Sequence, residues 1–233
     1  MKTLKATVLA GALALAFLAP GAANAVAKPV GKPAIEVLDE GFDNLTALPA
    51  WTFTNNSVPP GNTWFQGNAA VFGSQSGAPN SYAAASFLGS AGGLGVVDNW
   101  LITTVLALTG ITNLSFWTRH ENVPGFNDTL EVRFASGTGT GTAGFTTLLG
   151  TIGGAAGYPA DWTQWSGSLN VEGEGRFAFR YVGYADTLNY IGLDTVRVIT
   201  AVPEPSLFAM LALGLGALGA MRRKSLKSSM SSI

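Results

Sequence analysis

Aromatic side chains give this 233-residue chain its clearest chemical potential, because it holds six tryptophans and five tyrosines. A flat aromatic ring can stack on the apolar face of a sugar while its polar edge bonds a hydroxyl group. Trp117 is the best candidate, since in an alternating segment it shares a side with Ser115 and Arg119 and is expected to be exposed. The sequence therefore predicts a glycan contact at Trp117.

Other aromatic residues divide into two groups by their surroundings. Three lie in expected loops and could add to a glycan contact: Trp64, Phe65 and Tyr158. Three tryptophans are expected in the core, where they bury a large area: Trp51, Trp100 and Trp162.

Support for catalysis is weak. The single histidine, His120, stands beside Glu121 in a segment with proline and glycine, where a solvated side chain is expected. The chain has no Gly-x-Ser-x-Gly elbow, no His-Glu-x-x-His motif and no phosphate-binding loop. A hydrolase with two carboxylates across a cleft stays open among the 14 acidic residues. We predict a protein without enzymatic activity.

Composition excludes several other classes. With no cysteine the chain forms no disulfide or thiolate metal site, and one histidine excludes a multi-histidine site. All 14 acidic residues but only seven of the 13 basic residues lie between residues 26 and 205. This acidic body lacks the basic surface that a nucleic-acid partner requires.

The N-terminus has the three parts of a secretory signal peptide, predicted over residues 1–25. Lys2 and Lys5 precede an apolar run, and Ala23 and Ala25 supply the small residues of a cleavage site. We therefore expect the secretion machinery to export the chain, with residues 26–33 as a flexible lead-in to the mature domain.

The C-terminus combines a short motif with an apolar segment. Residues 201–206 form a linker that contains Val202, Pro203, Glu204 and Pro205, and residues 207–221 carry no charge. A helix over those fifteen residues would span roughly 22 Å, short of the roughly 30 Å hydrocarbon core. The basic cluster Arg222, Arg223 and Lys224 opens a tail, residues 222–233, that is expected to stay cytoplasmic.

This arrangement resembles the PEP-CTERM sorting signal of Gram-negative bacteria that produce exopolysaccharide. The resemblance implies that an exosortase, a transpeptidase of the inner membrane, recognises Pro203-Glu204-Pro205 and processes the tail. It also implies a route from a transient inner-membrane intermediate to the cell surface or extracellular matrix, with exopolysaccharide as an expected partner.

The body of the chain, residues 34–200, alternates with period two and shows almost no helical pattern. Residues 114–119, 129–134 and 176–181 each place apolar and polar side chains on opposite sides. Residues 89–95, 136–144 and 150–157 are rich in glycine and are expected to be loops. One-sided strands favour an all-β fold, an antiparallel β-sandwich of the jelly-roll type.

A change of phase is visible in the last strand. Ile191 and Leu193 have one parity, whereas Val196 and Val198 have the other. A slip of one residue would expose the later side chains unless a bulge absorbs it, so a β-bulge is predicted near Asp194-Thr195. Asp194 would then point inward, where a carboxylate needs hydrogen bonds or a cation.

The body also resembles the choice-of-anchor J domain, which is related to cleaved-adhesin and MAM-like jelly rolls. Six motifs in order carry the resemblance: Glu40-Gly41-Phe42-Asp43, Pro49-Ala50-Trp51-Thr52, Val97 to Thr103, Leu114 to Arg119, Phe177 to Tyr181, and Ile191-Gly192-Leu193-Asp194. It implies a structural calcium ion between the first and last strands, with Glu40, Asp43 and Asp194 at the matching positions. Thr195 stands where the family has a second Asp. The alternative is that these acidic side chains face solvent or bond backbone amides.

Together these patterns predict an exported surface or matrix protein associated with exopolysaccharide. A calcium-dependent glycan-binding or adhesin module is the alternative, and a glycan-acting enzyme is a third hypothesis.

Overall fold

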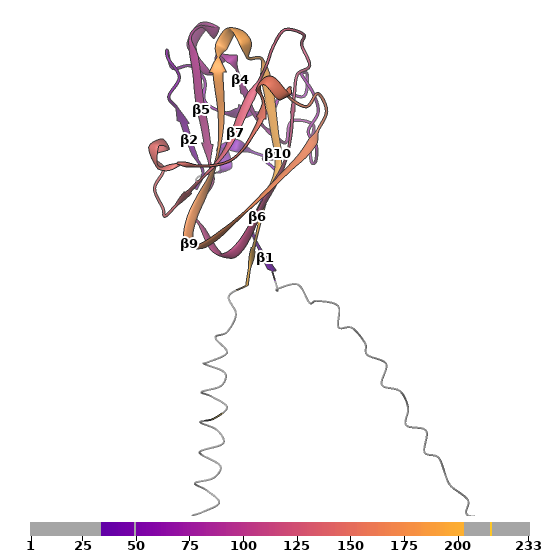
Figure 1. Ribbon diagram of the computed structural model, residues 1–233. Helices are drawn as coiled ribbons and strands as arrows, with labels where there is room; N and C mark the ends of the chain where they lie inside the picture. The colour runs from indigo at the N-terminus through magenta and orange to yellow at the C-terminus, as the bar shows by residue number, and fades with distance from the viewer. Residues whose placement is uncertain (1–33, 49, 203–214, 216–233) are drawn as a thin grey trace, which may run out of the picture. The chain divides into compact units, whose positions relative to one another are not determined.

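The computed structural model describes residues 34–48 and 50–202, and Leu215. It contains ten β-strands joined by loops and short 3₁₀ turns (Figure 1). The strands are β1 (Ala34–Glu40), β2 (Thr52–Asn55), β3 (Phe65–Gln66), β4 (Ala83–Ser86), β5 (Val96–Ile102), β6 (Leu106–His120), β7 (Thr129–Ser136), β8 (Thr147–Gly153), β9 (Thr163–Tyr184) and β10 (Tyr190–Ala201). The turns are η1 (Leu45–Ala47), η2 (Phe87–Gly89), η3 (Ala91–Gly93), η4 (Thr142–Gly144), η5 (Gly154–Ala156) and η6 (Ala185–Thr187).

The strands form two antiparallel layers that share β9. In the first layer β6 lies between β10 and the first half of β9, while β1 and β4 pair with the other edge of β10 and β3 follows β4. In the second layer the last part of β9 lies between β5 and β7, with β2 and β8 outside them. The predicted all-β sandwich is confirmed.

The long strand β9 turns from one layer into the other at the lower end of the domain in Figure 1. Its pairing with β6 ends at Gly175, where its pairing with β7 begins. Gly173 has a φ of 96°, a conformation that glycine adopts without strain. Gly175 has no room for a side chain, because a Cβ atom would lie 2.6 Å from the ring of Phe134. These glycines allow one continuous strand to close the sandwich.

The core lies between the layers and follows the predicted alternation. Phe116 of the first layer packs against Phe179 of the second, with ring centroids 5.1 Å apart. The inward residues of the three predicted strands are buried: Leu114, Phe116, Thr118, Leu130, Val132, Phe134, Phe177, Phe179 and Tyr181. Among the tryptophans expected in the core, Trp51 and Trp100 are buried, whereas Trp162 is only half-buried.

The predicted bulge is also present. Pairing between β10 and β6 shifts between Asp194 and Arg197, and Thr195 has a φ of 50°. As a result Ile191, Leu193, Val196 and Val198 are all buried although their parity changes. One loop prediction was wrong, because β8 extends to Gly153 through the glycine-rich segment expected to be a loop. Its pairing with β7 outweighs the flexibility of its glycines.

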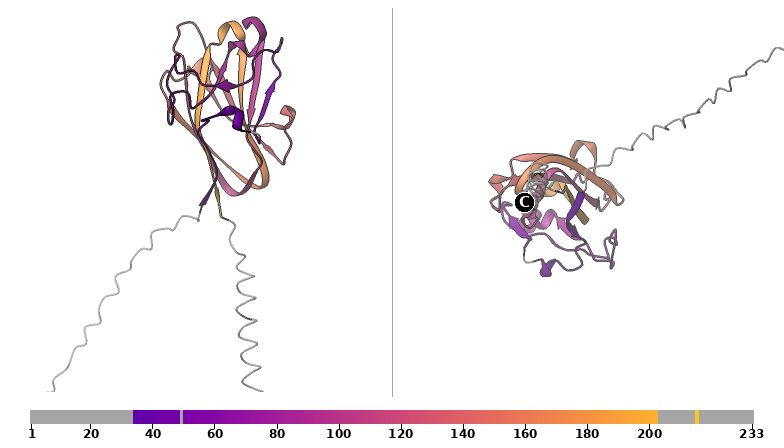
Figure 2. Two further views of the ribbon diagram at one scale, coloured as in Figure 1. Left: turned by 180° about the vertical axis from the view of Figure 1, so that it is seen from behind. Right: turned by 90° about the horizontal axis from the view of Figure 1, so that it is seen from below.

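The first and last residues of the described sandwich lie at the same end of it. Ala34 pairs with Ala201, so β1 and β10 leave the sandwich side by side, as the left view of Figure 2 shows. The predicted signal peptide, lead-in, sorting motif from Pro203 onward, most of the apolar segment and the basic tail lie outside the described residues. Within the part that is described, no helix has the length and apolar character needed to cross a membrane.

Candidate glycan-binding face

The outer face of the first layer carries a row of uncharged polar side chains on β6 and β9. We define the polar row as Asn113, Ser115, Gln164, Ser166, Ser168 and Asn170. Pairing between the strands sets Asn113 opposite Ser168 and Ser115 opposite Ser166. Four members are exposed at more than a third of their surface on β9, and Asn113 is exposed on β6.

The polar row follows from the alternation of the two strands. Leu114 and Phe116 lie between its members on β6 and point into the core, while Trp165 and Leu169 do the same on β9. Successive side chains of a strand point to opposite faces, so the intervening residues must face outward. Within the described residues, no side chain of the polar row takes part in a hydrogen bond with the protein. Their donors and acceptors therefore remain available to solvent or a ligand.

Trp117 stands at one end of the polar row. It pairs across the ladders with Gln164 of β9 and Asp194 of β10, and it is half-buried. Its predicted outward position is thus correct, although part of its surface is covered. Arg119, which shares that side, is half-buried and stacks over Phe72 at 4.5 Å from the ring centroid.

A pocket of about 670 Å³ opens at the other end of the polar row. Pairing of β6 with β10 ends at Asn113 and Ile199, beyond which the two strands separate. Thr200 fills part of the gap: its hydroxyl accepts from the Thr109 amide at 2.8 Å and donates to the Thr109 carbonyl at 2.9 Å. The pocket is lined by Ile111, Asn113, Asn170, Glu172 and Ala201, with others, so the polar row runs into it.

The loop aromatics proposed as additional sugar contacts are mostly unavailable. Trp64 and Tyr158 are buried, and only Phe65 is half-buried. The Trp64 indole donates to the carbonyl of Asn99, and the Tyr158 hydroxyl bonds that of Thr118 at 2.6 Å. Those two predictions were wrong, because the segments holding these rings fold back onto the sheets.

Of the three acidic residues predicted to bind calcium, Glu40 ends β1, Asp43 lies in the segment after it, and Asp194 lies in β10. Glu40 accepts from the backbone amide of Phe42 at 2.7 Å. The prediction that Asp194 points inward was wrong, because it pairs directly with Trp117 and so shares the outer side of the sheet. It is nevertheless fully buried under a loop, where it accepts from the amides of Gln75 and Ser76 at 2.8 and 3.1 Å. Asp43 approaches the same loop, since a Cβ atom on Gly77 would lie 3.1 Å from its Oδ1. The loop thus lies close to both Asp43 and Asp194.

The electrostatics of these carboxyls match their burial. Burial raises the pKa of Asp194, against the opposing effect of its backbone hydrogen bonds. Burial likewise raises the pKa of Glu40, and the charges of Asp43 and Asp39 add to the shift. Across the described part of the chain, no three acidic or histidine side chains gather into a cluster that could hold a metal ion. A calcium ion here would need main-chain oxygens as well, and the calcium site stays a prediction.

His120 differs from its predicted solvated position. It is buried at the end of β6, where its Nδ1 lies 3.0 Å from Oδ2 of the fully buried Asp128. Asp128 also accepts from the Tyr181 hydroxyl and from the Asn189 amide at 2.9 Å. Sequence reasoning missed this cluster, because only the fold brings Asp128 from the segment before β7 against β9 and the start of β10. These bonds tie the loops together at one end of the sandwich.

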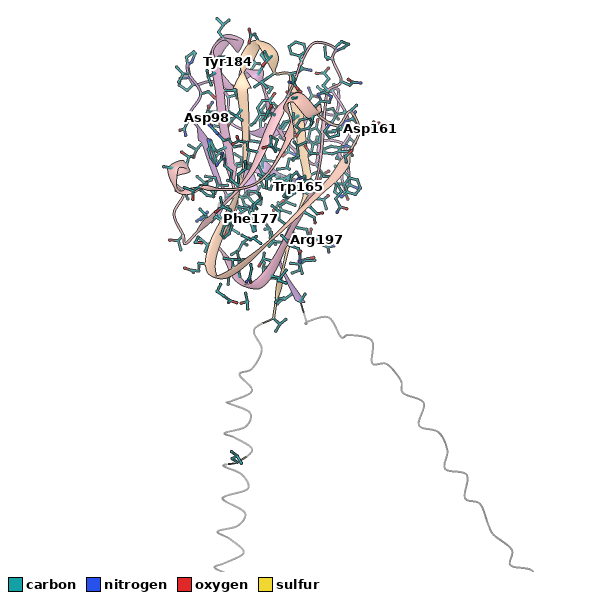
Figure 3. The ribbon with its side chains drawn as sticks, in the orientation of Figure 1. Asp98, Asp161, Trp165, Phe177, Tyr184 and Arg197 are labelled. Carbon is teal, nitrogen blue, oxygen red and sulfur yellow. The ribbon has the colours of Figure 1, made fainter. Side chains whose placement is uncertain are left out.

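The outer face of the second layer is charged and internally paired. Arg180 contacts Asp98 at 2.6 Å and Glu131 at 3.1 Å, and Arg133 contacts Glu131 at 2.7 Å. The indole of Trp100 donates to Asp98 at 2.6 Å, under the Arg180 guanidinium. Asp98 and Asp161 lie on opposite sides of the domain in Figure 3. The charged groups of this face are therefore paired with one another, and a shallow pocket of about 350 Å³ lies beside them.

Two comparisons place the chain among known proteins. The cleaved adhesin domain family matches residues 35–198. The chain belongs to the cleaved adhesin domain family. The PEP-CTERM protein-sorting motif matches residues 201–224, as the resemblance at the C-terminus predicted. No curated protein is similar to the chain by sequence.

Solved structures of the same family share the fold. The K1 cleaved adhesin domain of Lys-gingipain from Porphyromonas gingivalis W83 is 28% identical, with a TM-score of 0.55 over 72% of this chain and 99% of that domain. The K3 domain of the same protein is 25% identical, with the same TM-score and coverage. Together with the sorting motif, the adhesin domain indicates an exported cell-surface protein of a Gram-negative bacterium, and the motif implies processing by exosortase-type machinery.

Proposed function

We propose that this domain is a non-catalytic adhesin module that binds an extended, neutral glycan of the extracellular matrix. The observation that supports the proposal is the polar row, whose six uncharged side chains have no hydrogen-bond partner in the part of the protein that the structure describes and end at Trp117. Sugar hydroxyls both donate and accept, and amide and hydroxyl side chains do the same. The Trp117 ring would stack on the apolar face of one sugar unit.

The shape and charge of the face favour a neutral, extended polymer. From Ile111 to Trp117 the face extends roughly 20 Å at about 3.3 Å per residue, enough for several sugar units in line. The acidic body makes an anionic polysaccharide an unfavourable partner unless a cation bridges the two. In this proposal the exopolysaccharide is the ligand, and the secretion machinery, the inner membrane and an exosortase act only in delivery.

The test is co-sedimentation of the detergent-solubilised full chain with neutral exopolysaccharide from the producing organism. We expect saturable binding that Trp117→Ala weakens about 30-fold, the loss expected when a central aromatic contact worth about 2 kcal/mol is removed. Tyr184→Ala is the matched control, because Tyr184 is 67% exposed and lies at the end of the domain away from Arg197 (Figure 3). Equal binding by both variants would contradict the proposed site. Shortening of the polymer during long incubation would instead indicate an enzyme.

Calcium is a second element of the proposal, favoured by the position of Asp43 and Asp194 beside one loop. Repeating the sedimentation with calcium and with a chelator separates its roles. Loss of binding in chelator, reproduced by Asp43→Asn, would support a calcium-dependent module. Binding and thermal unfolding that are unchanged by chelator would remove calcium from the account.

A further inference from the structure

The first half of β9 has a free edge. Residues 163–175 pair with β6 on one edge, and on the other edge the pairing with β7 begins only at Gly175. Among the described residues, the backbone hydrogen bond that reaches this second edge comes from Gly137 to the carbonyl of Glu174. The backbone from Thr163 to Gly173 therefore presents unpaired amide and carbonyl groups on one side.

This edge lacks the features that normally protect a terminal strand. Natural edges are blunted by lysine and other charges, proline or bulges, since an open edge otherwise pairs with another chain. Residues 163–171 contain no charged residue and no proline, and their pairing with β6 is regular throughout. Trp165, Leu169 and Val171 on the inward side are also only partly buried. An added strand would cover both the backbone groups and these apolar surfaces.

The residue order along the edge is symmetric about Gly167. On either side stand Ser166 and Ser168, then Trp165 and Leu169, then Gln164 and Asn170, and finally Thr163 and Val171. If a second copy paired antiparallel with Gly167 facing Gly167, each residue would meet one of similar size or chemistry on the same face. Only Thr163 and Val171 differ in polarity, and both are β-branched. Gly167 itself has no room for a side chain, because a Cβ atom would lie 2.4 Å from the ring of Trp165.

We propose that two copies of the chain associate edge to edge through residues 163–171 of β9, related by a two-fold axis at Gly167. The contact is isologous, so it closes on itself and gives a dimer. The first layers of both copies form one continuous sheet, and the two polar rows come to lie side by side. A glycan chain could then contact both copies, although the dimer does not depend on the glycan.

Disulfide trapping tests the register directly, because the chain has no cysteine of its own. Full chain carrying Ser166→Cys is mixed in detergent with full chain carrying Ser168→Cys and oxidised. In the proposed register these positions face each other with Cβ atoms about 4.5–5.5 Å apart, whereas either variant alone places its thiols about 7–8 Å apart. We expect several-fold more covalent dimer from the mixture than from either variant alone or from Thr138→Cys, an exposed loop control. A mixture that gives no more dimer than Thr138→Cys would overturn the proposal.

A charge exchange gives a second, independent measurement by sedimentation velocity without glycan. In the double variant Ser166→Asp with Ser168→Asp, two pairs of like charges face each other across the contact between the copies. This variant should be monomeric. Ser166→Asp with Ser168→Lys places opposite charges there and should keep the dimer. Thr138→Asp with Thr140→Asp adds the same charge in the exposed loop after β7, outside the proposed contact at residues 163–171, and should leave the dimer intact. Identical masses for all three variants would contradict the two-fold register.

Discussion

The outer face of the second layer differs from the polar row of the first layer in whether its polar side chains bond one another. On the second layer, Arg180, Asp98, Glu131 and Arg133 bind one another across β5, β7 and β9. On the first layer, the members of the polar row face outward with no protein partner among the described residues. Charged groups that pair internally contribute to the fold, whereas uncharged groups left to solvent can be transferred to a ligand at a small cost in desolvation. Under the proposed function, the ion pairs of the second layer contribute stability, and the polar row of the first layer provides the glycan-binding face.

Removal of Arg180 should have the largest effect on stability. Its side chain is 25% exposed and bonds two carboxylates that are less exposed still. Since a hydrogen bond to a charged group contributes about 1.5–3 kcal/mol, Arg180→Ala should lower the free energy of unfolding by about 3 kcal/mol, measured by urea denaturation. Glycan binding should not change.

The matched change on the first layer is Arg197→Ala. Arg197 contacts Glu36 at 2.6 Å, but it is 49% exposed. An exposed pair of this kind contributes less than about 1 kcal/mol. Equal losses for Arg180→Ala and Arg197→Ala would remove the distinction between the two faces.

Truncation within the polar row should show the reverse pattern. Asn113→Ala and Ser166→Ala should each weaken glycan binding about 2- to 10-fold, the range for one neutral hydrogen bond of about 0.5–1.5 kcal/mol. Their free energies of unfolding should change by less than about 0.5 kcal/mol, because neither side chain forms a hydrogen bond with residues 34–48 or 50–202. A large loss of stability in either variant would mean that the row supports the fold.

Glu131 of the second layer and Asp194 of the first layer should change the free energy of unfolding in opposite directions as the pH falls. Burial would raise the pKa of Glu131, but the hydrogen bonds and charges of Arg133 and Arg180 hold it below the usual 4.5. A lowered pKa stabilises the fold above pH 4.5, and that contribution is lost as the pH falls through the folded value. Glu131→Gln should therefore flatten the fall in stability below about pH 4.5.

Asp194 should act in the opposite direction. Its pKa is raised above the usual 3.8 by burial, so its ionisation opposes folding. Stability from this group is present at low pH and is lost as the pH rises from 3.8 through the raised folded value. Asp194→Asn should remove that change, while the amide oxygen can still accept from Gln75 and Ser76. A curve identical to that of the unchanged protein would contradict this assignment.

The strands and the bulge could be predicted because they depend on local order. Alternation identified the inward side of residues 114–119 and 129–134, and the change of parity after Leu193 located the bulge. The outward position of Trp117 followed from the same alternation. Such patterns determine which side of a strand is apolar without reference to its neighbours.

The rest of the candidate site depends on which strands become neighbours. Asn113 and Ser168 are far apart in sequence, and only the pairing of β6 with β9 places them in one row. His120 and Asp128 are only eight residues apart, but they meet because a loop with Pro124 and Gly125 turns back on itself, and the fold then adds Tyr181 to their cluster. The sequence predicts that Tyr158 is exposed in a loop, but this loop packs against β6. The local order of residues does not predict which distant segments become neighbours.

The position of β10 has a mechanical consequence. This strand ends at Ala201, next to the sorting motif, and it pairs with β6 along one edge and with β1 and β4 along the other. Hydrogen bonds of antiparallel strands lie perpendicular to the strand axis. Tension applied at Val202 along that axis therefore loads these bonds in shear, all at the same time, instead of opening them one after another. A domain held by its C-terminal end would resist extraction by flow or by the pull of an attached polymer.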